Sequence, residues 1–297
     1  YKWEAKLSIP DLELIVEMAD FFDTSVDVLL GYEMKDNRLD ATVKRLQEYR
    51  RQKDGEGLAE AEKALASAAG FIQEDVVLHP GAGAWENPIY VIEYNFNDGD
   101  AKAGATIVTY MNSYNDPRRA SYFTAGSDGK YYGVRMGAAV DSNYPKSTLW
   151  SRVNCTNADP LKWMSGAEAD FLKAEFFLRQ GDAAAAKAAY EAGVKRSFAL
   201  AGASGADAYL RGTDGVGSYT DPVTGGNSYG NNLTDVAVSW DSQSETEGHL
   251  EQILTQKYIA MFPEGMEAWA EFRRTGYPRV GPTATNKSVA PCVHRQA

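Results

Sequence analysis

Five side chains between residues 131 and 150 are of types that can bind a sugar. They are the aromatic and amide residues Tyr131, Tyr132, Asn143, Tyr144 and Trp150. Flat aromatic rings supply apolar contact for the face of a sugar ring, and an amide supplies directional hydrogen bonds. The run GVRMGAAVDSNYPKSTLW, which contains three of them, has no clear periodicity and predicts a long loop. The five are therefore candidate ligand-binding residues; the alternative is that the rings anchor the loop to its scaffold.

A second irregular stretch, 202–241, is dense in Gly, Asn, Asp and Ser. A loop of this length inside a compact domain is usually functional or mobile. Tyr219, Tyr229 and Trp240 are further candidate contacts within it. Its acidic residues could hold Ca²⁺, although the stretch contains no EF-hand loop with a terminal Glu. The sequence leaves a structural ion open and predicts no other metal or cofactor.

The scaffold for these loops begins with a helical hairpin over 165–197. Ser165 and Glu168 have the spacing of a capping box at the start of the first helix. Gly181 stands where a left-handed residue can end that helix, and Asp182 can cap the next one. The sequence therefore predicts two short antiparallel helices joined by a tight turn.

The two helices are expected to pack through one face each. On the first, an apolar stripe with helical spacing is formed by Phe171, Leu172, Glu175 and Leu178. On the second, small or short side chains would allow close approach of the backbones, namely Ala185, Ala189, Ala192 and Val194. This arrangement is typical of tetratricopeptide-type hairpins, which are docking scaffolds. The fold class is mainly α, with tetratricopeptide-like hairpins, long irregular loops and at most a small β-hairpin.

That β-hairpin is expected around the turn 127–129, with Tyr122–Phe123 and Tyr131–Tyr132 on its arms. Further helices are expected over 104–114, after Ser244, and after Pro263. Ser244 and Glu247 have the spacing of a second capping box, and Trp269 is expected in the core.

Composition and motifs exclude several classes of protein. The chain has 297 residues with 41 acidic and 30 basic side chains, so its net charge of −11 argues against a nucleic-acid binder. None of its three histidines lies in an H-E-x-x-H or zinc-type spacing, and neither G-x-S-x-G nor a P-loop occurs. No run of 18 or more apolar residues is present to span a membrane. We expect a non-enzymatic protein.

Three blocks of sequence, in order, resemble the SusD-like nutrient-binding outer-membrane lipoproteins. They are SYNDPRRASYF (113–123), ADFLKAEFFLRQGDAAAAKAAYEAGVKRSF (169–198) and ILTQKYIAMFPEGMEAWAEFRRTGYPR (253–279). The resemblance covers about 69–281 and is to the C-terminal half of such a protein. It implies oligosaccharide binding at the bacterial outer-membrane surface and delivery of the ligand to a TonB-dependent transporter. It also implies attachment to the membrane only through a lipid anchor, for which this chain carries no lipoprotein cysteine or signal peptide near Tyr1.

Residues 1–68 resemble a different family, the phage-repressor-like (XRE-type) helix-turn-helix regulators. The matching residues are Trp3, Glu4, Ser8, Ile9 and Pro10. In that family the helix that reads DNA would precede Tyr1, so DNA binding is not expected. Two domains are therefore predicted, 1–68 and 69–297. The alternative function is a fragment of a transcriptional regulator or a protein-interaction scaffold.

Overall fold

The computed structural model describes residues 59–60, 62–67, 70–79, 86–96, 99 and 101–285. The chain divides into two compact units, Phe71–Val289 and Tyr1–Gly70 with Ala290–Ala297. In the second of these, backbone at 59–60 and 62–65 is helical, with an exposed ion pair between Lys63 and Glu60. The helix-turn-helix resemblance at Trp3–Pro10 lies outside the described residues. All that follows concerns the unit Phe71–Val289.

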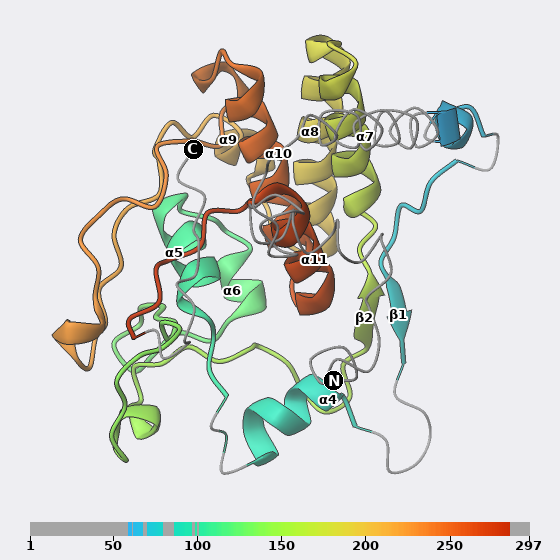
Figure 1. Cartoon of the computed structure of the whole chain (residues 1–297). Helices are drawn as coiled ribbons and strands as arrows, with labels where there is room; N and C mark the ends of the chain where they lie inside the picture. Colours follow the sequence, from blue (N-terminus) through green and yellow to red (C-terminus); the bar gives the residue numbers. More distant parts are fainter. Residues whose placement is uncertain are drawn as a thin grey trace, which may run out of the picture. The chain divides into compact units, whose positions relative to one another are not determined.

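The predicted helical hairpin forms α7 (Glu168–Arg179) and α8 (Ala183–Leu200). The two helices run side by side, and α10 (Thr246–Met261) packs against both (Figure 1). The turn is as predicted: Gly181 has φ +80°, and the Asp182 side chain accepts a hydrogen bond from the backbone N–H of Ala185. The mainly helical fold class is confirmed.

The predicted cap at the start of the hairpin is wrong. The N-cap residue of α7 is Ala167, which makes no side-chain capping bond, and Ser165 lies two residues before that N-cap. The second predicted capping box is wrong for the same reason, because Glu245 and not Ser244 precedes α10 and again makes no side-chain cap. Capping-box spacing identifies a helix start only to within a residue or two.

Close packing in the hairpin depends on a residue that the alanine pattern did not identify. A Cβ atom on Gly193 would lie 3.0 Å from ring atoms of Phe171 on the facing helix. Ala192, expected at this contact, is exposed, and Leu172 of the predicted stripe is 48% exposed. Phe171 and Val194 are fully buried, as predicted. The contact face is therefore rotated by about one residue from the predicted one.

Replacing Gly193 by Val is expected to lower the free energy of unfolding by about 1–3 kcal/mol, because the added methyl groups meet the Phe171 ring. The control is Ala192→Val on the exposed side of the same helix turn, which introduces the same side chain into α8 without the clash. Urea unfolding of the two variants measures the difference. Equal stabilities would contradict this packing.

A two-stranded antiparallel sheet joins distant parts of the unit, β1 (Val76–Leu78) and β2 (Leu161–Met164). The predicted hairpin at 122–132 is not formed. Ser127 and Asp128 do make a turn, but Tyr122 belongs to α6 and Phe123 pairs with Val153 instead. Local turn chemistry was correct, whereas the strand partner was decided by the rest of the fold.

The remaining elements are short, apart from α5 and α11. They are α4 (Pro88–Tyr90), the π-helical turn η1 (Val91–Asn95), α5 (Ala105–Ser113), α6 (Arg119–Tyr122), α9 (Ala206–Tyr209), α11 (Gly265–Thr275) and the 3₁₀ turns η3 (Tyr144–Lys146), η4 (Gly225–Asn227) and η5 (Trp240–Ser242). None of the described helices is long and apolar enough to cross a bilayer. The buried core runs through α5, α7, α8 and α10 and includes Met111, Phe171, Tyr190 and Ile253.

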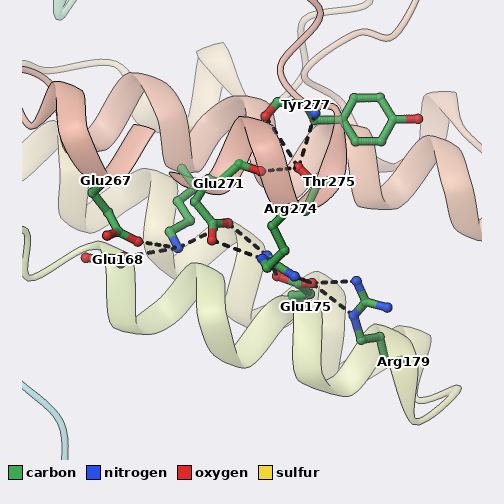
Figure 2. Close-up of polar contacts among 9 residues, drawn as sticks. Glu168, Glu175, Arg179, Glu267, Glu271, Arg274, Thr275 and Tyr277 are labelled. Atoms are coloured by element: carbon green, nitrogen blue, oxygen red, sulfur yellow. Dashed lines mark hydrogen bonds and ion pairs between the residues drawn. The ribbon is translucent and has the colours of Figure 1, made fainter. Parts of the chain in front are cut away.

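Helix α11 is held to α7 and α10 by charged side chains (Figure 2). Lys257 of α10 is only 2% exposed and lies 3.0 Å from the Glu168 carboxylate and 3.3 Å from that of Glu271. Arg274 of α11 bonds both oxygens of Glu175 at 2.7 Å. Trp269 of α11, expected in the core, is 55% exposed.

Candidate functional site

The two long loops predicted from the sequence are joined to each other by hydrogen bonds. We call the assembly of 126–150 and 217–229 the loop platform. Tyr144 and Trp150 lie at its centre, 2% and 3% exposed, with ring centroids 4.9 Å apart. The indole N–H of Trp150 donates to the Tyr144 backbone oxygen at 2.7 Å. These two rings hold the loop together and offer little surface to a ligand.

Asp221 connects the second loop to this pair. The Tyr144 hydroxyl donates to the Asp221 carboxylate at 2.5 Å. The same carboxylate accepts the backbone N–H groups of Val223 and Thr224 at 2.8 Å, which shapes the turn that follows. Burial, followed by the hydrogen bond to the anionic carboxylate, raises the pKa of Tyr144 above its usual value. The Tyr144 hydroxyl is therefore a permanent donor.

Asn227 and Arg135 form a second set of connections. The Asn227 amide makes a paired contact with Ala139, accepting from its N–H at 2.8 Å and donating to its oxygen at 3.1 Å. Arg135 donates to the backbone oxygens of Asn227 and Ser228 at 2.8 and 2.9 Å. Its guanidinium also lies over the Tyr229 ring, 5.1 Å from the centroid. Asp221, Asn227 and Arg135 are not among the site residues predicted from the sequence, and no local signal identifies them, since their partners lie 77–93 positions away.

Tyr131 and Tyr132 lie on the other side of the same loop. Arg119 covers one face of Tyr131 at 4.6 Å, so that ring is half-buried. The Tyr132 hydroxyl donates to Asp128 at 3.1 Å near the surface, and its backbone pairs with Ser151, next to Trp150. Tyr132, like Tyr131, is half-buried.

Three apolar side chains of the platform are exposed. Met136, Val140 and Val223 are exposed by 66%, 62% and 40%. Asn143 is exposed beside them in sequence, and its N–H is fixed by the Asp141 carboxylate at 2.8 Å. Hydrogen bonds within the platform hold its backbone in place. Exposed apolar side chains and an amide on such a backbone can bind a ligand without rearrangement of the loops.

The remaining candidates of the second loop make contacts within the fold. Tyr219 pairs with Tyr229 in an isolated bridge and donates to the Gly133 oxygen at 2.7 Å. Trp240 is buried against His249, with ring centroids 4.0 Å apart. Among the described residues, no group of three or more His, Cys, Asp or Glu side chains is arranged to hold a metal ion.

Comparison with known families decides the identity of this scaffold. The family model described as SusD-like, Susd and RagB outer membrane lipoprotein, matches residues 45–296. The chain belongs to the SusD-like family. The match extends over the helical hairpin, the loop platform and α11 alike, and it does not favour the alternative of a transcriptional regulator fragment.

Solved SusD homologues have the same fold. One from Bacteroides thetaiotaomicron is 40% identical with a TM-score of 0.69, covering 79% of this chain and 49% of the homologue. One from Bacteroides uniformis is 37% identical with a TM-score of 0.71, covering 78% and 49%. A chitin-binding SusD homologue from Flavobacterium johnsoniae is 35% identical with a TM-score of 0.69, covering 77% and 48%. This chain therefore spans about half the length of the homologues, and the comparison with curated proteins finds no match.

Proposed function

We propose that this chain is a non-catalytic glycan-binding protein of the bacterial outer-membrane surface. The observation that carries the proposal is the loop platform, a cross-linked pair of loops that presents apolar and amide groups on a SusD-like scaffold. A SusD homologue of the same fold binds chitin, a polymer of a neutral amino sugar. Neutral oligosaccharides are the ligand class that such a mixed apolar and hydrogen-bonding surface favours.

Within the platform, the five candidate residues divide into two roles. Tyr132 and Asn143 contact the ligand directly, with Tyr131 beside them, because their side chains are the accessible ones. Tyr144 and Trp150 are positioning residues, since both are buried and hold the loop in one conformation. We further propose that the captured oligosaccharide passes to a TonB-dependent transporter and that a lipid anchor attaches the protein to the membrane. The family description, an outer membrane lipoprotein, supports the anchor.

Calorimetric titration with soluble oligosaccharides, including chitin fragments, tests this function. Asn143→Ala is expected to weaken binding about tenfold, because one amide contributes hydrogen bonds of about 1–1.5 kcal/mol. Asp221→Asn is expected to weaken it by a similar factor through loss of loop rigidity, without touching the ligand.

The control is Gln180→Ala at the exposed end of α7, which should leave the affinity unchanged. Chromatography of the oligosaccharides after long incubation should return them uncleaved. An unmodified chain that binds none of the oligosaccharides, or an Asn143→Ala variant of full affinity, would remove the platform as the site.

A further inference from the structure

Helix α11 turns its charged side chains toward the protein. Glu267, Glu271 and Arg274 recur at steps of four and three residues, which places them on one face of the helix. On that face Arg274 bonds the Glu175 carboxylate of α7 at 2.7 Å, and the Glu271 carboxylate lies 3.3 Å from Lys257 Nζ of α10 (Figure 2). A surface helix of a globular protein normally does the reverse and turns its apolar face inward.

The apolar side chains of α11 lie on the outward face. Met266 is 83% exposed, and Trp269, one turn later, is 55% exposed. The Trp269 ring stacks on that of Phe272, with centroids 5.9 Å apart and an interplanar angle of 26°. None of the residues Gly265–Thr275 is buried. We call Met266, Trp269 and Phe272 the α11 stripe; exposed apolar surface of this kind marks an interaction site.

An exposed side chain of α7 lies near this surface. Leu172 follows Glu168 by four residues and precedes Glu175 by three, so the three share one face of α7. The two carboxylates are held on that face by ion pairs to Lys257 and Arg274. Leu172 itself is 48% exposed. Two neighbouring helices thus leave apolar side chains exposed next to the ion pairs that join them.

The comparison with solved homologues indicates what can cover the α11 stripe. This chain covers only 49%, 49% and 48% of the three homologues described above, so about half of each homologue has no counterpart in the match. The family model that the chain matches includes α11. Hairpins of the tetratricopeptide type bury their apolar faces by stacking on neighbouring hairpins. An amphipathic helix from the uncovered half of a homologue therefore fits the stripe.

A lipid surface fits the stripe less well. Helices that lie in a membrane interface carry Lys and Arg on their polar face. The polar face of α11 includes Glu267 and Glu271, and its ion pairs are made with α7 and α10. The net charge of −11 also disfavours approach to an anionic leaflet.

We infer that the α11 stripe, together with Leu172, docks a helical segment of the half of a SusD-like protein that this chain does not cover. The inference rests on the family and on the inverted orientation of α11. It does not depend on glycan binding by the loop platform, because the stripe shares no residue with 126–150 or 217–229.

Co-expression tests the docking. The probe is the part of the Bacteroides thetaiotaomicron SusD homologue that lies outside its match with this chain, produced together with the whole 297-residue chain carrying an affinity tag. We expect the two to purify together in equal amounts and to elute as one complex in size-exclusion chromatography. The double variant Met266→Glu, Trp269→Glu is expected to lower the amount of bound probe at least about tenfold, because buried aromatic anchors dominate binding at interfaces.

The control is the double variant Ile92→Glu, Phe96→Glu, which adds the same charges at side chains that are 57% and 62% exposed. It should bind as much probe as the unmodified chain. Without the probe, the Met266→Glu, Trp269→Glu variant should unfold at nearly the same temperature as the unmodified chain, because the stripe then faces solvent.

A purified chain that carries no probe, or a Met266→Glu, Trp269→Glu variant that carries the full amount, would overturn the inference. So would a dimer of this chain, or its flotation with phospholipid vesicles, that the same variant abolishes. In those cases the stripe binds a second copy or a lipid surface instead.

Discussion

Replacing Arg118 by Met is expected to lower the free energy of unfolding by about 3–5 kcal/mol, because it leaves the Asp116 carboxylate buried and unpaired. The guanidinium and the carboxylate are both fully buried and lie 2.5 Å apart. Arg118 also donates to Ser197 of α8 and to Gln256 of α10, at 2.8 and 3.0 Å. Burial alone would lower the pKa of Arg118. The charge of Asp116 has the larger combined effect with its hydrogen bond and raises the pKa above its usual value, so the guanidinium stays charged. One substitution therefore disconnects three parts of the scaffold.

The double variant Asp116→Asn, Arg118→Met separates charge from packing. It removes both charges but keeps an oxygen for the Arg118 backbone N–H, which Asp116 accepts at 2.9 Å. We expect it to recover part of the stability lost in Arg118→Met. Arg211→Met, at an exposed position, should change stability by no more than about 0.5 kcal/mol. Chemical unfolding of all three measures these differences; a double variant no more stable than Arg118→Met would contradict an ion-pair role.

Replacing Lys257 by Met is expected to cost about 2–3 kcal/mol near neutral pH, since it leaves the Glu168 carboxylate without its cation and leaves Glu271 with Arg274 alone (Figure 2). The value is below that for Arg118 because the two carboxylates are partly exposed, by 15% and 13%, and solvent screens them. Lys195→Met, in an exposed pair with Asp207, is the control and should leave the free energy of unfolding nearly unchanged, because solvent screens the pair.

The Lys257 effect should depend on pH. Burial would raise the pKa of Glu271, but the hydrogen bond from Arg274 and the charge of Lys257 lower it below its usual value of 4.5. A carboxyl group whose pKa is lowered by folding stabilises the folded state at pH values above its usual pKa. That stabilisation is lost as the pH falls through the lowered pKa. The unmodified chain thus loses this contribution in acid, while protonation removes the unpaired charge in the variant. The difference between them should shrink between pH 7 and pH 3, and a constant difference would show that packing, not charge, dominates.

The loop platform shows why hydrogen-bond partners that are distant in the chain could not be predicted from the sequence. Its composition, rich in Tyr, Asn, Asp and Gly, was sufficient to predict irregular loops. The pairing of Tyr144 with Asp221 joins positions 77 apart, and the chain offers many equivalent acids. For the same reason, the sequence predicted five equal candidates, whereas burial separates the accessible Tyr132 and Asn143 from the enclosed Tyr144 and Trp150.

The sequence by itself determined the family, the helical hairpin and its turn, since Gly181 and Asp182 act through local backbone geometry and hydrogen bonding. Only the tertiary structure decided which helix face is buried, that Gly193 is the close contact, and that Ser165 lies before α7 without capping it. It also decided that the aromatic loop is cross-linked to a second loop. The physical reason is the separation along the chain of the residues that interact. Caps and turns depend on neighbours within four residues, whereas packing and buried hydrogen bonds depend on contacts between segments that local propensities do not specify.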